Sequence, residues 1–533
     1  MNGGIVTPLS WRSFEHELSS HPDKAFADSV VSGIKFGFSL GFDGPQLSYN
    51  SGNMASVQEH NQVVKKYIET EVAEGRVHGP FREHPLENFR CNPIGVVPKK
   101  EVDKFRFIMN LSAPRDSSVN DFIDKDRYSL SYVTVDDAID KIVSLGPGCL
   151  LSKVDVASAF RIVPVREEDW NLLGFGFQGD FYYDTVLSMG GRSSPAIFDL
   201  VAEAAEWICI NRYQVEHLLH LLDDFLSIEA PGSDGSSLGK ILEAFEALGI
   251  PVNEKKVSGP TSILEFLGIV LDTLKMEARL SPEKVAKISD LFVSFKGRKK
   301  CTQRELLSLI GGLSFACKVI RPGRSFLSRL VSLAYSVREL YHFIRLPNDI
   351  KKDINIWLLF LQEWNGREFF LRTEVWWPDS VFSTDAAGSL GFGGLFEKEW
   401  FSAPWSEAQR SWSIETQELY PIVVASQVWG KRWSSSRILI KCDNLSVVNC
   451  VNKGYSKVPI MGDLLRVFMY NSMRYNFLFR AEHVPGVDNK LADLLSRLLP
   501  QEFRRRAAWT DPEPVPLPPC PLRLSEEVFN VTW

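Results

Sequence analysis

The stretch Leu221-Leu222-Asp223-Asp224-Phe225-Leu226 places two adjacent carboxylates between two apolar runs. It predicts a β-hairpin whose apolar flanks are buried strands and whose turn presents the two acids at its tip. Adjacent aspartates in an apolar context are costly unless a cation or a partner compensates their charge. Turns and helix caps also use Asp-Asp freely, so the pair alone is better explained by an ordinary turn.

A third aspartate strengthens the interest of this stretch. Ser152 to Phe160 reads Ser-Lys-Val-Asp-Val-Ala-Ser-Ala-Phe, so Asp155 ends an expected strand and small residues separate it from the aromatic ring. A strand-end aspartate can join the pair at 223–224 around Mg²⁺ ions. Two hard cations held by carboxylates can activate a primer hydroxyl and stabilise a leaving pyrophosphate. The small residues leave space for a nucleoside triphosphate, with Phe160 under its sugar.

Composition and charge limit the classes of protein to which this chain could belong. The net charge of −6 does not exclude nucleic-acid binding, because phosphate contacts depend on local basic patches. Basic runs occur within 296–300, 318–329 and 504–506, although a run of this kind is usually just a solvated face. Eight scattered cysteines without a Cys-x-x-Cys pair argue against a zinc knuckle or a disulfide framework. With no apolar run of membrane-spanning length and no secretory pattern at the start, we expect an intracellular protein, cytoplasmic or nuclear, without a membrane partner.

Length and patterning predict a multidomain protein of α/β class, since 533 residues exceed what one hydrophobic core supports. Between Asn92 and Asp272 short β-rich runs alternate with helical stretches, whereas from Ser281 to Trp364 the strand signals vanish. A second α/β block runs from Val381 to near Leu499, followed by a basic, then proline-rich tail that we expect to be extended and poorly ordered. The expected strands are Ile94–Pro98, Phe105–Asn110, Leu150–Val154, Arg161–Val165, Phe181–Val186 and Leu226–Ile228, and the expected helices are Gln58–Glu74, Pro195–Val215 and Leu238–Leu248.

The order of these blocks resembles a retroelement reverse transcriptase. Pro98-Lys99-Lys100 with 104–112 (Lys-Phe-Arg-Phe-Ile-Met-Asn-Leu-Ser) resembles the fingers motif, which implies that Lys99 and Arg106 hold the incoming dNTP. Residues 155–160 resemble the first palm motif, which implies that Asp155 is a metal ligand and that Phe160 is the steric gate against a 2′-hydroxyl. Asp223 and Asp224 match the two aspartates of the polymerase active-site box.

Three further motifs follow in the expected order. Met189 to Phe198 resembles the motif that opens the template-side helix, and the resemblance places Gly190 at the dNTP. Asn253-Glu254-Lys255-Lys256 resembles the lysine-bearing motif, with either lysine as its counterpart, and 265–269 resembles the primer grip. The likeness is closest to the DIRS type, the retrotransposons that also carry a tyrosine recombinase. That subtype is indicated by Ser117-Ser118-Val119-Asn120-Asp121, by Gln303-Arg304-Glu305-Leu306 with Leu309-Ile310-Gly311, and by Arg321-Pro322-Gly323-Arg324.

The polymerase box departs from its family at two positions. Leu221 stands where the family usually has an aromatic residue that packs against the primer end, so its presence would lower activity without removing metal binding. Met189 stands where phenylalanine or glutamine is usual. His217 and His220, just upstream of the acids, are expected to pack rather than to bind metal.

The second α/β block carries four acids at separate strand ends and helices. Asp385 ends a strand in Ser383-Thr384-Asp385-Ala386-Ala387, and Glu418 faces inward from a helix that starts near Thr416. Ile438 to Lys441 is an apolar strand that runs into Cys442 and Asp443, while Asp493 lies on a helix ten residues after His483. Such acids would repel one another unless cations occupied the gap between them.

This block resembles a ribonuclease H domain. The resemblance implies that Asp385, Glu418, Asp443 and Asp493 form a metal-binding quartet and that His483 assists product release or proton transfer. Two Mg²⁺ ions bridging a phosphodiester would let water attack and the 3′ oxygen leave. Asp488 and Glu415 are the alternative acids, and Glu418 is preferred because an apolar stretch continues its helix.

Together the resemblances imply an RNA-directed DNA polymerase with ribonuclease H activity, acting by two-metal phosphoryl transfer with two Mg²⁺ per site, or Mn²⁺. The implied partners are RNA template, DNA primer, RNA–DNA hybrid and dNTPs, with a recombinase and a Gag-like protein on other chains. A domesticated or decayed copy that only binds nucleic acid is the alternative. The expected domains are an N-terminal extension (1–88), fingers and palm (89–278), a helical thumb and connection (279–378), ribonuclease H (379–500) and the tail (501–533).

Overall fold

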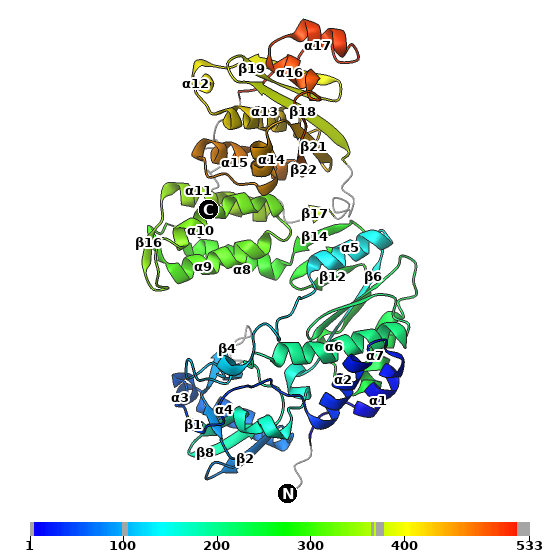
Figure 1. Cartoon of the computed structure of the whole chain (residues 1–533), viewed down its shortest axis with the longest axis vertical. Helices are drawn as coiled ribbons and strands as arrows, with labels where there is room; N and C mark the ends of the chain where they lie inside the picture. The colour runs from blue at the N-terminus through cyan, green and yellow to red at the C-terminus, as the bar shows by residue number, and fades with distance from the viewer. Residues whose placement is uncertain (1–4, 99–104, 296, 364–366, 369–377, 520–533) are drawn as a thin grey trace. The chain divides into compact units, whose positions relative to one another are not determined.

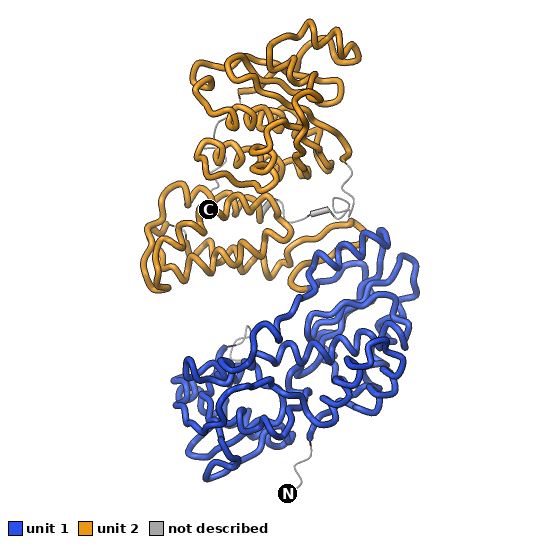
Figure 2. Tube along the Cα trace, viewed as in Figure 1, with its two compact units in different colours: residues 1–266 blue, residues 267–533 orange. Residues whose placement is uncertain are grey.

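The computed structural model describes residues 5–98, 105–295, 297–363, 367–368 and 378–519 (Figure 1). The chain divides into two compact units, residues 1–266 and 267–533 (Figure 2). The boundary predicted at residue 278 therefore lies inside the second unit. In the described ranges no helix is both long enough and apolar enough to cross a membrane.

The first unit is built on two sheets and a separate hairpin. A four-stranded sheet has the order β11-β6-β10-β9, and a five-stranded sheet has the order β1-β3-β7-β8-β2. β4 and β5 form a two-stranded hairpin of their own. Their strands are β1 (Tyr49–Asn50), β2 (Val77–Phe81), β3 (Arg90–Asn92), β4 (Ile94–Pro98), β5 (Phe105–Met109), β6 (Leu150–Asp155), β7 (Gly174–Phe177), β8 (Asp180–Asp184), β9 (Leu218–Leu221), β10 (Asp224–Glu229) and β11 (Ser258–Thr261). A further strand, β12 (Ile263–Phe266), belongs to neither sheet and ends the unit.

Helices pack on the four-stranded sheet because its strands present apolar residues to them. Leu151, Val154, Phe225 and Ile228 are all buried, and α6 and α7 pack against each other and against these strands. The helices are α1 (Trp11–Glu17), α2 (Lys24–Phe36), α3 (Ala55–Glu59), α4 (Asn61–Ala73), α5 (Val135–Leu145), α6 (Ser194–Asn211) and α7 (Ser237–Leu248), with 3₁₀ turns η1 (Leu18–Ser20), η2 (Asn120–Phe122), η3 (Ala159–Ile162), η4 (Glu167–Leu173) and η5 (Glu254–Lys256).

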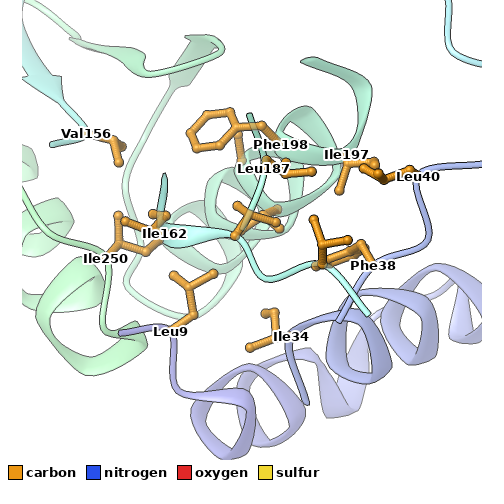
Figure 3. Packing of buried hydrophobic residues seen from close by; sticks show 14 of the residues in the cluster. Leu9, Ile34, Phe38, Leu40, Val156, Ile162, Leu187, Ile197, Phe198 and Ile250 are labelled. Atoms are coloured by element: carbon orange, nitrogen blue, oxygen red, sulfur yellow. The ribbon is translucent and has the colours of Figure 1, made fainter. Parts of the chain in front are cut away.

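The N-terminal residues share the core of the first unit. Figure 3 shows Leu9 and Ile34 packed in one apolar cluster with Ile162 and Ile250. The backbone is tied in as well, since Ser10 N donates to the carbonyl oxygen of Leu248 at 2.9 Å. The segment expected as an N-terminal extension therefore has no core separate from that of the sheet.

Two local predictions for this unit are wrong. Arg161 to Val165 was expected as a strand, but its first residues form the 3₁₀ turn η3, and Pro164 and Val165 make only isolated bridges. The expected helix Gln58–Glu74 is interrupted at His60, which separates α3 from α4. In both places the chain changes direction to join elements that are distant in sequence, and periodicity does not report such a change.

The second unit begins with a mainly helical block. It contains β13 (Ile269–Asp272), β14 (Glu277–Leu280), α8 (Pro282–Phe295), β15 (Lys300–Thr302), α9 (Gln303–Ala316), η6 (Arg321–Phe326), α10 (Ser328–Ala334), β16 (Phe343–Arg345), α11 (Asn348–Glu363) and β17 (Arg367–Glu368). The prediction that strands are absent after Ser281 is wrong, because β15 and β16 pair as an antiparallel ribbon. Each strand has only three residues, too few to produce an alternating pattern.

An α/β block follows, with a five-stranded sheet of order β20-β19-β18-β21-β22. β18, β19 and β20 are antiparallel neighbours, whereas β18, β21 and β22 run parallel. Its elements are β18 (Ser380–Ala387), β19 (Gly391–Phe396), β20 (Glu399–Pro404), α12 (Glu407–Arg410), α13 (Ile414–Val428), β21 (Arg437–Cys442), α14 (Leu445–Lys453), α15 (Pro459–Arg474), β22 (Leu478–His483), α16 (Lys490–Ser496) and α17 (Pro500–Arg506).

Polar contacts join the helical block to the α/β block inside this unit. Arg466 on α15 forms a buried ion pair with Asp353 on α11, and Arg329 Nη2 lies 2.8 Å from Asp463 Oδ1. The described part of the tail, up to residue 519, is more regular than predicted, because its basic start is helix α17 and its continuation follows the outer edge of β20. Val515 N donates to the Trp400 carbonyl oxygen at 2.9 Å.

Candidate active sites

The acidic hairpin, residues 218–229, forms as the sequence predicts. β9 and β10 pair antiparallel with Leu221 opposite Asp224, so Leu222 and Asp223 make a two-residue turn. On its other side β10 pairs with β6, and Asp224 lies opposite Asp155. The amide of Val156 also donates to the carbonyl oxygen of Asp223 at 2.9 Å. The structure therefore brings the three predicted aspartates together at one end of the sheet.

The three carboxylates influence one another. Asp155 is 3% exposed, and the side chains of Asp223 and Asp224 are partly buried. Burial raises the pKa of Asp223, and the neighbouring charges of Asp224 and Asp155 act in the same direction. Cations are needed to offset such a concentration of negative charge.

Two lysines supply part of that compensation. Lys256 Nζ lies 2.8 Å from Asp155 Oδ2, and Lys153 Nζ lies 3.1 Å from Asp224 Oδ1. Asp155 also accepts a hydrogen bond from Asn253 Nδ2 at 3.2 Å. Of the two lysines that the sequence left open, Lys256 is thus the one that reaches the acids. The hydrogen bond to Asp155 raises the pKa of Lys256, so this side chain stays cationic.

The turn of the acidic hairpin is strained at Leu222, whose φ of +51° falls in the left-handed region. Two-residue hairpin turns need a positive φ at one or both central positions and usually place glycine or asparagine there. Leu222 instead packs its partly buried side chain against the core of the first unit. A strained backbone that persists beside clustered acids is typical of a functional site.

A histidine fastens the hairpin to helix α6. His220 on β9 contacts the carboxylates of both Glu206, through Nδ1, and Asp199, whose Oδ1 lies 3.4 Å from Nε2. Despite the opposing effect of burial, these two acids raise the pKa of His220 to about 9. His220 was expected to pack, and its contacts with these two acids join β9 to α6.

The remaining predicted dNTP residues lie on η3, on the loop before α6 and on β5. The Phe160 ring is half-buried and makes an edge contact with Phe198 of α6 at a centroid distance of 5.6 Å. The following residue, Arg161, is buried and holds η3 by pairing with Glu71 at 2.6 Å and with Asp184 at 2.7 Å. The turn that carries Phe160 is therefore held by ion pairs to two other elements.

The loop at Gly190 is also anchored. Gly190 has a φ of +124°, and a Cβ there would lie 2.7 Å from the Met109 carbonyl oxygen, so no other residue fits. The Asn120 side chain donates to the Gly190 carbonyl oxygen at 2.8 Å and accepts from the amide of Arg192 at 2.8 Å. Arg106 is exposed on β5, and Lys99 lies outside the described residues.

The second site forms at the centre of the five-stranded sheet in the second unit. Asp385 lies on β18, Asp443 directly follows the neighbouring strand β21, and Glu418 lies on α13, which packs against β18. Asp385 and Glu418 are buried at 5% and 4% exposure, while Asp443 and Asp493 are partly exposed. Ligand atoms of Glu418, Cys442 and Asp443 all lie within 4.8 Å of one another.

The acids of the quartet repel one another electrostatically. Burial, together with the charges of Asp385 and Asp443, raises the pKa of Glu418 to about 9. Burial also raises the pKa of Asp385 to about 6, to which Asp443 and Asp493 add and which a hydrogen bond from Ser496 opposes. Acids held in this way favour protons or cations, and oxygen ligands of this kind suit Mg²⁺ and Mn²⁺.

Neither alternative acid is buried as Asp385 and Glu418 are. Asp488 is exposed, and Glu415 does not contribute to the shifted pKa values of Asp385 and Glu418. His483, at the end of β22, is exposed and its Nε2 lies 3.0 Å from the carbonyl oxygen of Asp443.

Several residues that build the two sites were missed in the sequence. Asn489 donates through Nδ2 to the Thr384 carbonyl oxygen at 2.8 Å, and Ser496 hydrogen-bonds to the Asp385 carboxylate, so α16 is fixed to β18 at both ends. Lys153 was available from strand periodicity, because it precedes Asp155 by two residues and shares its face. Asn120 carried no signal of its own, since its contact with Gly190 depends on the tertiary fold.

Comparison with known proteins agrees with this geometry. Residues 97–271 match the family model of reverse transcriptase (RNA-dependent DNA polymerase). This match covers β5, β6, the acidic hairpin and both lysines described above. Over these residues the chain is therefore similar to reverse transcriptases.

The similar proteins are distant in sequence. The Transposon Tf2-3 polyprotein of Schizosaccharomyces pombe is 20% identical over 449 residues, which cover 80% of this chain and 30% of that protein. Polyprotein P3 of Commelina yellow mottle virus is 26% identical over 232 residues, covering 42% of this chain and 11% of that protein. The chain thus spans about a third or less of the length of these relatives.

Solved structures share the fold. The foamy viral protease-reverse transcriptase in complex with dsDNA superposes with a TM-score of 0.51 at 14% identity, covering 90% of this chain and 98% of that one. The same viral protein in complex with RNA/DNA hybrid gives a TM-score of 0.50 at 13% identity, covering 90% and 63%. The mixed α/β multidomain class predicted from the sequence is confirmed.

Proposed function

We propose that this chain is an RNA-directed DNA polymerase that copies retroelement RNA into DNA and hydrolyses the RNA of the resulting hybrid. The register of the acidic hairpin carries the first activity, because it sets Asp224 opposite Asp155 with Asp223 in the adjoining turn. The family match over residues 97–271 supports the same reaction. The second activity is supported by the buried, coupled acids of the five-stranded sheet.

In the polymerase site Asp155, Asp223 and Asp224 would hold Mg²⁺ or Mn²⁺. The donor set fits hard cations, because carboxylate oxygens are their preferred ligands. The pKa of Asp223 is raised by burial, with a further contribution from the charges of Asp224 and Asp155. Such ions, when bound, promote deprotonation of a primer hydroxyl and neutralise the leaving pyrophosphate. Lys256 keeps the Asp155 carboxylate oriented, and Phe160 supports the sugar of the dNTP from its anchored turn.

The triphosphate would lie toward the fingers. The exposed Arg106 on β5 is free to reach a phosphate, and Lys99 is proposed as its partner from the motif alone. Gly190, held by Asn120, lets a ligand approach the backbone where a side chain would stand in the way. These groups bind and orient the nucleotide, which is the main protein contribution to phosphoryl transfer.

In the ribonuclease H site Asp385, Glu418, Asp443 and Asp493 would hold the cations. His483 is exposed beside the Asp443 backbone, a position from which it can exchange a proton with solvent or with a departing strand. The proposed partners are RNA template, DNA primer and RNA–DNA hybrid, and the foamy viral neighbours were solved with dsDNA and with RNA/DNA hybrid.

We also propose the DIRS subtype and an intracellular site of action, with the recombinase and a Gag-like protein on other chains. The subtype rests on the sequence motifs, one of which contains Asn120. Asn120 donates a hydrogen bond to the Gly190 carbonyl oxygen, so this motif has a structural role in the first unit.

A primed RNA template with Mg²⁺ and dNTPs tests the polymerase, and a labelled RNA–DNA hybrid tests the nuclease. Extension by the wild type that is lost in Asp223→Asn and Asp224→Asn supports the first activity, and hybrid cleavage lost in Asp443→Asn supports the second. The atypical Leu221 and Met189 are the features that keep open the alternative of a decayed copy that only binds nucleic acid. Hybrid binding by a wild type that neither extends nor cleaves would establish that alternative.

A further inference from the structure

The β15–β16 ribbon in the second unit has one buried and one exposed face. The strands pair with Lys300 opposite Arg345 and Cys301 opposite Ile344. Because successive side chains on a strand point to opposite faces, Cys301 and Ile344 share the inner face, where they are 0% and 4% exposed. Lys300 and Arg345 therefore share the outer face with Phe343, which is one residue before Ile344.

Large aromatic rings stand exposed on and beside this outer face. Phe343 is 62% exposed, and Tyr341, two residues earlier, is 71% exposed. Exposed apolar side chains that cluster, unlike scattered ones, mark interaction sites. Lys300 Nζ lies 4.5 Å from the centroid of the Phe343 ring, so a cation and a ring form one surface.

The backbone that carries these rings is held in place. The Arg304 amide donates to the Leu340 carbonyl oxygen at 3.0 Å, and the Leu346 amide donates to the Lys299 carbonyl oxygen at 2.9 Å. The buried Gln303 side chain donates to the carbonyl oxygens of Ala334 and Val337, both at 2.9 Å. Hydrogen bonds therefore hold the backbone on both sides of the exposed rings.

The charge around the rings is mainly positive. Lys299 and Arg338 are exposed, and within the described part of the chain neither they nor Arg345 form an ion pair with a carboxylate. Arg298 is neutralised by Glu305, whose Oε1 lies 2.9 Å from Arg298 Nη2. Glu339, which follows Arg338 in the sequence, is an exposed acid. We define the ribbon surface as Lys299, Lys300, Arg338, Tyr341, Phe343 and Arg345.

We infer that the ribbon surface is a binding site for single-stranded nucleic acid. Surfaces that bind single strands combine cations for the phosphate backbone with exposed rings on which bases stack. A duplex keeps its base faces stacked inside, so it would use the cations of this surface but not its rings. An uncharged protein partner would use the rings but would leave the cations without a role.

No residue of the ribbon surface belongs to either carboxylate site. The inference does not rest on the proposed catalytic function, because binding to the ribbon surface requires neither divalent metal nor dNTP. In a chain that copies single-stranded templates, such a surface would hold unpaired template or displaced strand outside the active sites.

The test uses the full chain in EDTA, with fluorescence anisotropy of a labelled oligouridylate of about 15 nucleotides, a length within the range of single-strand sites. A blunt RNA–DNA hybrid of equal length is the second probe. The double variant Tyr341→Ala/Phe343→Ala is expected to weaken single-strand binding by about tenfold or more, with hybrid affinity unchanged. Trp509→Ala, which removes a ring that is 55% exposed elsewhere, is the matched control and should leave both affinities unchanged.

Charge variants test the second half of the inference. Lys299→Ala and Arg338→Ala should each reduce the slope of log affinity against log salt by about 0.7 on the single strand. Lys431→Ala, at an exposed lysine of the α/β block, is the control and should not change the slope. These substitutions are at exposed positions, so circular dichroism should show unchanged folding.

Two results would overturn the inference. One is single-strand affinity that the ring variant leaves intact, and the other is an equal loss on both probes. If the ring variant instead changed sedimentation of the protein while oligouridylate binding persisted, the ribbon surface would be a contact between copies of this chain. An inactive wild type in the extension assay would remove the proposed polymerase function without affecting any of these binding results.

Discussion

Asp224 on β10 lies directly opposite Asp155 on β6, in a sheet whose register continues for six residue pairs to Glu229 and Leu150. The two acids come from strands separated by the whole of α6, yet regular backbone pairing sets them side by side. Because a shift of one residue would turn every side chain on β10 to the other face, the buried residues of that strand protect the register. The position of the acids is thus a consequence of core packing.

Lys256 and Lys255 provide a matched pair for testing the lysine motif. Lys256→Ala should reduce the rate of primer extension by about tenfold, because it removes a charge-assisted hydrogen bond to Asp155. Lys255→Ala removes an equal charge one residue away, at an exposed position, and should leave the rate within about twofold. Steady-state extension kinetics on one primed template make the comparison. Equal losses in the two variants would mean that Lys256 acts only through general charge.

Through its contacts with Glu206 and Asp199, His220 should contribute to the stability of the first unit in a pH-dependent way. Its pKa is raised to about 9, above the ordinary value, so the stabilisation is complete below about pH 6.5 and is lost as pH rises through about 9. His220→Gln should therefore lower the thermal unfolding temperature at pH 7, by an amount that shrinks above pH 9. Calorimetry of both proteins across this range measures the difference. A gap that stayed constant with pH would show that the ring packs without carrying charge.

Without metal, Glu418 should make the second unit less stable as pH rises, whereas an acid with a lowered pKa makes a fold more stable as pH rises. The pKa of Glu418 is raised to about 9, so the fold favours the protonated form, and stability in EDTA should fall as pH rises from about 5 to about 9. Glu418→Gln should remove most of that slope. Since cations replace the proton, the affinity for Mg²⁺ should increase over the same pH range. Thermal unfolding in EDTA and Mg²⁺ titration of hybrid cleavage check the two statements, and a pH-independent wild type would contradict them.

Substitutions at Asn489 and Asp488 distinguish a residue that positions the second site from a neighbouring residue that does not. Asn489→Ala removes the hydrogen bond that ties the start of α16 to Thr384, and it should reduce hybrid cleavage by about tenfold while primer extension stays unchanged. Asp488→Ala, at the adjacent exposed residue, should change neither activity. Loss of cleavage in Asp488→Ala would move the metal-binding role toward that acid.

Sequence reasoning predicted the elements whose information is local. The strand ending at Asp155, helix α6 and the acidic hairpin each have their own apolar pattern, and the structure places them where the patterns predict. The acids of the second block were found in the same way, two at strand ends and two on helices. The roles assigned to them remain predictions.

The features that were missed depend on contacts between distant segments. The β15–β16 ribbon has three residues per strand, and its pairing cannot be seen in either strand alone. The N-terminal segment joins the core because Leu9 and Ile34 meet residues far along the chain. Asn120 and Ser496 likewise gain their positions from tertiary hydrogen bonds, which no spacing in the sequence reports.

Primer extension on an RNA template in Mg²⁺, comparing the wild type with Asp155→Asn, Asp223→Asn and Asp224→Asn, tests the central claim most directly. Each variant should lose extension by at least about a thousandfold, as expected for a ligand of catalytic metal. Because Asp223 carries a raised pKa, Asp223→Asn should fold as stably as the wild type in EDTA or slightly more so. Extension that persisted in these folded variants would contradict a polymerase site built on the pairing of Asp155 with Asp224.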